Sequence, residues 1–440
     1  MSINHRKLVA LGLASFCLAA GAGAADFPIH DGDRVVFLGD SITEQKLYTT
    51  YIESYVLTRY PIWKLSFRNT GWGGDTAWLR QRFHPDEGKL FAATDADQQA
   101  MVEDSVKRGL ERDVLPLRPT FVTIDFGMND HEYQAFREDI FRAYVRSQTQ
   151  LAKDLEAAGA RVAFITPQPI EEKRPDPDQD VRNQSLRKFS DGLKEVAAKE
   201  NALYADEFDP YMKIMMDARA ANPAAFIGGG DSVHPKQPGH TLMAWAILKA
   251  LGAPTDVSQA EIAVPAGTVT SSDHCTISNV KATDGGLSFD RLDEALPMPI
   301  DAKAEPALKL APVLNDLSRY MIKVTGLTPG NYDIKIDGDS ATQATDEKLA
   351  AGLNLSDLPG PLRNQGRKIL DLVIKKNDLF FHRWREVQLY NLPKWAQNSA
   401  SDEGRAAEVA TEDKQIAELE SQIDEARKPA LHHFEIKRAN

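Results

Sequence analysis

Short apolar runs alternate with longer helical stretches between residues 26 and 255, and this alternation limits the possible fold more than any other feature. Strands that are separated by helices build βαβ units, which form a parallel sheet covered by helices on both faces. Five runs have the length of buried strands: 34–39, 64–68, 121–126, 161–166 and 203–205. Helical stretches lie at 44–59, 98–115, 132–158, 181–200 and 238–251. We therefore predict an α/β domain over 26–255, with ligands at the carboxyl ends of its strands.

The chain has 440 residues, and its pattern changes after this domain. Prolines and glycines interrupt it near 253–268, and 269–340 has the pattern of β structure, with a hairpin signal at Thr328–Asn331. After Asp346 the apolar residues return to helical spacing. We divide the chain into the α/β domain at 26–255, a small sandwich-like β module at 256–345 and a C-terminal helical region at 346–440.

The parts after residue 255 leave two questions open. The β module could bind carbohydrate or serve as structural packing, and we favour packing. Residues 377–385 place aromatic and basic side chains in one helical stretch. This stretch could bind an acidic partner or dock onto the α/β domain, and we favour docking. Residues 403–427 have the composition of a surface helix rather than of an extended coiled coil.

The first 25 residues have the pattern of a secretory signal peptide. Basic residues precede an apolar run at 8–20, and the small residues at 22–24 form a cleavage site. The apolar run is shorter than the roughly 20 residues of a membrane span, which disfavours the alternative of an uncleaved anchor. We expect a secreted or periplasmic protein with no membrane span after cleavage. The sequence has two cysteines, and loss of Cys17 with the signal leaves only Cys275.

Four short polar motifs follow strand ends or precede helices. Gly39-Asp40-Ser41-Ile42-Thr43 follows the first strand, so the Ser41 hydroxyl and N–H lie at a helix N-terminus, where negative charge is stabilised. Asn69-Thr70-Gly71-Trp72-Gly73-Gly74-Asp75-Thr76 follows the second strand, and its glycines allow backbone amides to approach a ligand. Taken alone, the first motif could be a helix cap and the second an ordinary turn.

The other two motifs add a side-chain donor and a base. Gly127-Met128-Asn129-Asp130 follows the third strand, and the Asn129 amide can donate to developing negative charge. Asp231-Ser232-Val233-His234-Pro235 precedes the last helix, and its carboxylate can orient the imidazole as in serine hydrolases. Each also has a structural alternative, an Asn turn and a surface Asp–His pair. Four such motifs in order at one edge of a sheet favour a catalytic site.

In this order the motifs resemble the blocks of the SGNH (GDSL-like) hydrolase superfamily, over about 26–255. The resemblance implies a three-layer, flavodoxin-like α/β/α sandwich with a five-stranded parallel sheet. It also implies that Ser41 is the nucleophile, that His234 is the base and that Asp231 orients it. The oxyanion hole would consist of the Ser41 and Gly74 backbone amides and the Asn129 side chain.

These assignments predict hydrolysis of an ester through an acyl-enzyme, without metal or cofactor. We favour short acyl groups, especially O-acetyl groups on polysaccharide. Lipase, lysophospholipase or arylesterase activity is the alternative within the hydrolases. Outside them, the chain could be a polysaccharide O-acetyltransferase or a non-catalytic glycan-binding protein. The aromatic residues Trp72 and Trp78 could line the substrate pocket or only pack the loops.

The net charge and the spacing of the histidines disfavour other classes of function. The net charge of −12 disfavours a nucleic-acid partner, which would require a basic face. The histidines at 84, 131 and 240 lack the spacing of metal ligands. No feature of the sequence predicts the oligomeric state.

Overall fold

The computed structural model describes residues 27–83, 85–174, 176–283 and 285–439. The expected signal peptide at 1–25 lies outside these residues. A five-stranded parallel sheet forms the centre of the N-terminal half, with the strand order β2-β1-β3-β4-β5. Its strands are β1 (Arg34–Gly39), β2 (Ser66–Asn69), β3 (Phe121–Asp125), β4 (Arg161–Ile165) and β5 (Leu203–Ala205). The predicted α/β sandwich is confirmed, and the second strand begins two residues later than expected.

Helices cover both faces of this sheet because its strands are apolar on both sides. In β1, Val35 and Phe37 join one hydrophobic cluster, while Val36 and Leu38 join the other. This is the alternation that a strand imposes on successive side chains. On the first face lie α2 (Leu47–Arg59), α8 (Phe208–Ala221) and α9 (Gln237–Ala250). On the second face lie α5 (Asp95–Asp113), α6 (Glu138–Ala157) and α7 (Val181–Lys199). Short helices α1 (Ser41–Glu44), α3 (Arg80–Phe83) and α4 (Glu87–Ala92) occupy the connections.

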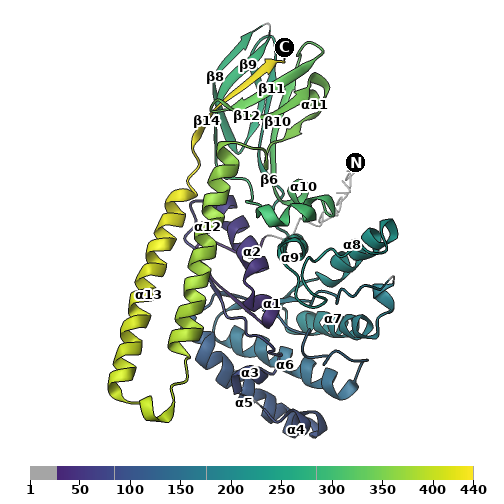
Figure 1. Ribbon diagram of the computed structural model, residues 1–440, viewed down its shortest axis with the longest axis vertical. Coiled ribbons are helices and arrows are strands. Elements are labelled where there is room, and N and C mark those ends of the chain that lie inside the picture. The colour runs from purple at the N-terminus through teal and green to yellow at the C-terminus, as the bar shows by residue number, and fades with distance from the viewer. Residues whose placement is uncertain (1–26, 84, 175, 284, 440) are drawn as a thin grey trace, which may run out of the picture.

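The β module lies beyond one end of the α/β domain and consists of two sheets (Figure 1). One has the order β13-β10-β6-β7 and the other β12-β11-β14-β9-β8. They enclose a third hydrophobic cluster, to which Tyr320, Tyr332 and Phe434 belong. The strands are β6 (Asp256–Ala263), β7 (Thr268–Asp273), β8 (Cys275–Thr283), β9 (Gly286–Asp293), β10 (Arg319–Thr325), β11 (Asn331–Ile336), β12 (Asp339–Thr345), β13 (Leu353–Asn354) and β14 (Leu431–Arg438).

The expected boundary at residue 346 is wrong, because β13 and β14 come from the supposed helical region. Strand β14 pairs with β9 on one side and with β11 on the other, so it is a central strand of its sheet. Conversely, the 3₁₀ helix Ala302–Lys309 and α10 (Val313–Leu317) pack with the α/β domain although they lie within 256–345. Strand pairing joins segments that are distant in sequence, so the local change of pattern at residue 346 did not reveal that β13 and β14 belong to the β module.

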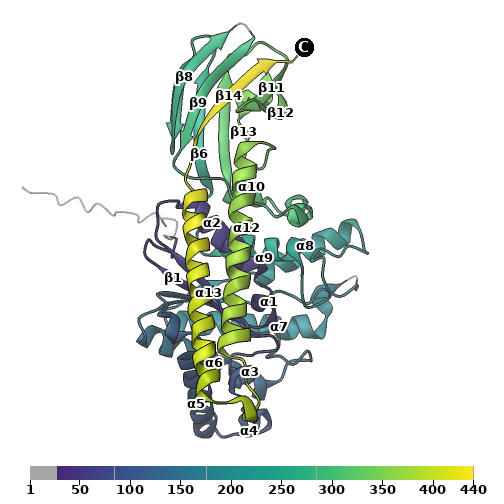
Figure 2. The same ribbon diagram turned by 60° about the vertical axis from the view of Figure 1, so that its left-hand side comes forward.

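A helical hairpin runs along the α/β domain (Figures 1 and 2). It consists of α12 (Pro361–Phe381), a π-helical turn at His382–Gln388 and α13 (Ser399–Ala426); α11 (Asp346–Ala351) precedes it. Lys376 of α12 is buried and forms an ion pair with Glu53 of α2, with 2.5 Å between Nζ and Oε1. The expected docking of residues 377–385 is confirmed: Trp384 meets Trp72 edge to face at 5.8 Å. None of the helices that the structure describes combines the length and apolar composition needed to cross a bilayer.

Candidate active site

Ser41 lies where β1 turns directly into α1. Asp40 caps this helix, and its Oδ1 accepts a hydrogen bond from the Ile42 N–H at 2.9 Å. The turn is so tight that a Cβ at Gly39 would lie 2.1 Å from Thr43 Oγ1, so only glycine fits there. The Ser41 N–H belongs to the first turn of the helix, where backbone donors have no acceptor within the helix.

Ser41, His234 and Asp231 form a connected hydrogen-bonded chain. Ser41 Oγ lies 2.9 Å from His234 Nε2, and His234 Nδ1 lies 3.2 Å from Asp231 Oδ2. The other oxygen of Asp231 accepts the N–H groups of Val233 at 2.8 Å and His234 at 2.7 Å. Burial alone would raise the pKa of Asp231, but these backbone bonds and the imidazole outweigh it and lower that pKa below its usual value. An ionised Asp231 favours the tautomer with a proton on Nδ1, which leaves Nε2 free to accept from Ser41.

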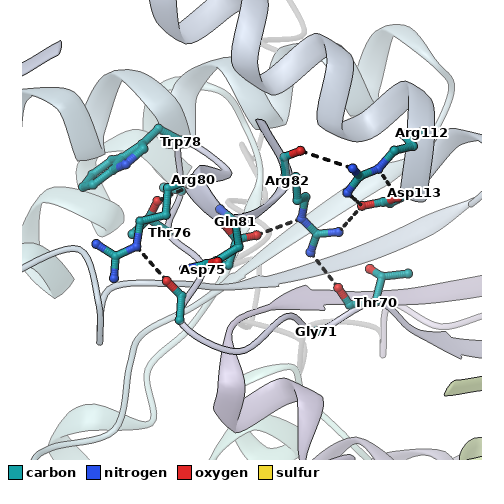
Figure 3. A network of polar contacts seen from close by, with 12 residues as sticks. Thr70, Gly71, Asp75, Thr76, Trp78, Arg80, Gln81, Arg82, Arg112 and Asp113 are labelled. Carbon is teal, nitrogen blue, oxygen red and sulfur yellow. Dashed lines mark hydrogen bonds and ion pairs between the residues drawn. The ribbon is translucent and has the colours of Figure 1, made fainter. Parts of the chain in front are cut away.

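The glycine-rich loop that follows β2 lies beside the hydrogen-bonded residues Ser41, His234 and Asp231. Hydrogen bonds from arginine side chains fix its conformation. Gly74 has a φ of +75°, a conformation that favours glycine, and its N–H has no acceptor within the described part of the protein. Its carbonyl accepts from Arg80 Nε at 2.7 Å. Arg82 is fully buried and donates to Asp75, to the Thr70 carbonyl and to Asp113 (Figure 3). This network holds the loop, and with it the Gly74 N–H, in one place.

Asn129 connects the glycine loop to the nucleophile turn. Its Nδ2 donates to the Asp75 carbonyl at 2.9 Å and to Asp40 Oδ2 at 3.2 Å, and its Oδ1 accepts from the Tyr133 hydroxyl at 3.0 Å. The next residue, Asp130, accepts the N–H groups of Ala77 at 2.8 Å and Gly127 at 2.9 Å. Burial raises the pKa of Asp130 to about 7. Through its two hydrogen bonds, Asp130 connects the loop that contains Ala77 to the loop that contains Gly127 beneath the site.

Sequence comparison agrees with this geometry. Residues 37–242 match the sequence model of the GDSL-like Lipase/Acylhydrolase family. This part of the chain belongs to the GDSL-like, or SGNH, hydrolases. Its expected nucleophile, base and orienting carboxylate are the three side chains that the fold brings into one hydrogen-bonded chain.

Two relatives extend the comparison. A curated acetylxylan esterase from Geobacillus stearothermophilus is 25% identical over 233 residues, which cover 51% of this chain and 96% of that enzyme. Among solved structures, a gut microbial diltiazem-metabolizing enzyme is 26% identical with a TM-score of 0.77, over 95% of this chain and 100% of the other. The second similarity therefore includes the β module and the hairpin. The protein is a carboxylic-ester hydrolase.

Of the two aromatic residues considered for the pocket of this GDSL-like hydrolase, the structure removes one, Trp78. Trp78 is fully buried and donates its indole N–H to Glu87 at 2.8 Å, so it cannot contact a substrate and packs the loops instead. Trp72 is half-buried and already has a partner, because the Arg385 guanidinium lies 3.6 Å from the centre of its ring. Stacking of a sugar on that face would require Arg385 to move.

Sequence reasoning missed Glu44 and Tyr133 in this region, and it did not pair Arg385 with Glu44. Arg385 donates to Glu44 at 2.9 Å, one helical turn after Ser41, although 341 residues separate Arg385 from Glu44 along the chain. No local pattern could have paired them. Tyr133 is different, because it follows Asn129 by only four residues and a hydroxyl so close to the third motif could have been considered.

Proposed function

We propose that this protein is a secreted serine esterase that hydrolyses short-chain acyl esters, especially O-acetyl groups on carbohydrate. The observation that carries the proposal is the continuous path from Ser41 Oγ through the His234 ring to Asp231, with contacts of 2.9 and 3.2 Å. It is the arrangement that activates a serine hydroxyl, which is a weak nucleophile on its own.

The reaction begins when Ser41 Oγ attacks the ester carbonyl and His234 Nε2 takes its proton. The carbonyl oxygen becomes an oxyanion, which accepts hydrogen bonds from the Ser41 and Gly74 N–H groups and from Asn129 Nδ2. His234 then gives its proton to the departing alcohol, leaving an acyl-enzyme. Water, activated by the same imidazole, releases the acid and restores Ser41.

Both protons of Asn129 Nδ2 have acceptors before substrate binds. The bond to Asp40 at 3.2 Å is longer than the bond to the Asp75 carbonyl at 2.9 Å. Asp40 is buried, and burial together with the nearby Asp125 raises its pKa, which favours the neutral carboxyl and a weaker acceptor. The oxyanion, a full charge, would therefore draw this proton away from Asp40.

The relatives support the substrate class. An acetylxylan esterase is similar to about half of the chain, and the enzyme of similar overall structure metabolises diltiazem. Polysaccharide acetyl esters and small-molecule esters are thus the substrates to test first. Secretion, expected from residues 1–25, would bring the enzyme into contact with polysaccharide.

The test compares wild type with Ser41→Ala on p-nitrophenyl acetate, butyrate and octanoate, and on acetylated xylo-oligosaccharides. We expect activity that falls with chain length, release of acetate from the oligosaccharides and no activity in Ser41→Ala. Equal activity in both proteins would remove Ser41 as the nucleophile. Preference for octanoate would replace acetylesterase with a lipase-like function, and acetyl transfer to a sugar in preference to water would identify a transferase.

A further inference from the structure

The chain bends unusually after Asn129 and thereby returns Tyr133 to it. Glu132 and Tyr133 have φ values of 50° and 55°, in the left-handed region that residues with a Cβ seldom occupy. The Glu132 N–H donates to the Asn129 carbonyl at 3.1 Å and closes the turn. Two successive residues in this conformation persist only where the surroundings impose it, and such strain gathers at functional sites.

The bend gives the Tyr133 hydroxyl a specific partner. It donates to Asn129 Oδ1 at 3.0 Å, while the ring lies 5.1 Å from that of His131. Tyr133 is 39% exposed, and yet its hydroxyl is bonded to Asn129. A primary amide has one acceptor and two donor positions, so fixing the oxygen of Asn129 also fixes the direction of its Nδ2 protons.

We propose that Tyr133 is a positioning residue of the oxyanion hole, which holds the Asn129 amide in the orientation from which one Nδ2 N–H can donate to the oxyanion in place of Asp40. The inference rests on the proposed function, in which Asn129 binds the oxyanion. Bonds from Nδ2 to the Asp75 carbonyl and to Asp40 hold one side of the amide and the Tyr133 hydroxyl holds the other, so loss of that hydroxyl loosens the orientation of the amide. The bond to Oδ1 also polarises the amide and makes its N–H groups stronger donors.

The hydroxyl keeps its proton under the conditions in which an esterase works. Burial, together with the neighbouring Asp40, raises the pKa of Tyr133 to about 12. Tyr133 therefore donates to Asn129 throughout the neutral and mildly alkaline range.

Tyr133→Phe tests the inference, because it removes the hydroxyl and leaves the ring. We expect kcat for p-nitrophenyl acetate to fall about 2- to 12-fold, which corresponds to the loss of one hydrogen bond, with KM within about twofold of wild type. Tyr204→Phe is the matched control, because its hydroxyl bonds to the Ser190 carbonyl at 3.3 Å and should be catalytically silent. Thermal unfolding of both variants checks that the fold is kept.

A double-mutant cycle decides whether Tyr133 acts through Asn129. In an Asn129→Ala background, Tyr133→Phe should cause no further loss of kcat. An equal loss in both backgrounds, a change confined to KM, or an unchanged kcat in an active enzyme would each overturn the inference and leave the proposed esterase intact. An inactive wild type would overturn both.

Discussion

Replacing Lys376 with methionine should lower the free energy of unfolding of the protein, because it leaves the buried Glu53 carboxylate without its positively charged partner. Lys376 and Glu53 are 1% and 3% exposed, and Lys376 Nζ also donates to the Phe67 carbonyl at 3.2 Å. Asn377 supports the pair by donating to the second oxygen of Glu53 at 3.0 Å. These contacts join α12 to α2 and β2, and thereby join the hairpin to the α/β domain.

The size of the effect follows from the balance between burial and attraction. Burial is the larger influence on both groups: it raises the pKa of Glu53 and lowers that of Lys376, despite their mutual attraction. Removing one partner from such a pair costs about 3–5 kcal/mol, whereas replacing both with uncharged groups is often neutral or stabilising. We therefore expect a loss of about 3–5 kcal/mol for Lys376→Met and recovery of most of it in Glu53→Gln/Lys376→Met.

Denaturant unfolding followed by tryptophan fluorescence measures this loss, since Trp72 and Trp384 lie at the hairpin contact. Lys375→Met is the matched control, because the neighbouring Lys375 is exposed and its replacement should change stability by less than about 0.5 kcal/mol. If Lys376→Met were as mild as Lys375→Met, or if the double variant were weaker than the single one, the reasoning would be refuted.

Variants at three other positions test the site and its surroundings. Asn129→Ala should lower kcat about 10²- to 10³-fold in steady-state assays, the usual loss for one oxyanion donor, and an unchanged rate would remove it from the mechanism. Arg385→Ala should cost about 1–2 kcal/mol in thermal unfolding, and Arg385→Lys should not recover it fully, because an ammonium cannot stack on Trp72 as a guanidinium does. Burial raises the pKa of Asp125 to about 7, so the folded protein binds its proton more tightly than the unfolded chain and stability falls as pH rises from about 4 to 7. Asp125→Asn should remove this part of the pH dependence, which amounts to up to about 4 kcal/mol of stability at pH 8. Thermal unfolding at pH 5 and pH 8 measures it, and the same change of stability between the two pH values in both proteins would contradict the prediction.

The α/β domain and the positions of its motifs could be predicted because their causes are local. Each strand is a short apolar run, and each motif directly follows a strand or precedes a helix. Parallel strands place their carboxyl ends at one edge, so Ser41, Gly74 and Asn129 had to converge there once the sheet was recognised. The sequence does not reveal the exposure of individual loop residues, so it left Trp78 undecided between the pocket and loop packing until the structure showed that it is buried.

The second half was harder to predict because its contacts join distant segments. The apolar alternation in β14 is as clear as in other strands, with Phe434 and Ile436 buried. What it lacked was a neighbouring strand in sequence, since a helical hairpin separates it from β13. A strand isolated in this way looks like the end of a helical region.

The position of β14 also explains how the hairpin can influence a site built entirely by the other half of the chain. Because β14 pairs on both sides, the β module is complete only after α12 and α13 have extended along the α/β domain and brought the chain back to the module. The hairpin is therefore held at its open end by the module and along its length by Lys376 and Glu53. Near its far turn, Arg385 lies over Trp72 and pairs with Glu44, and each of these contacts is weak alone. Since Trp72 lies in the loop that carries Gly74 and Glu44 lies in the helix that carries Ser41, Arg385 brings the hairpin into contact with both segments of the catalytic edge.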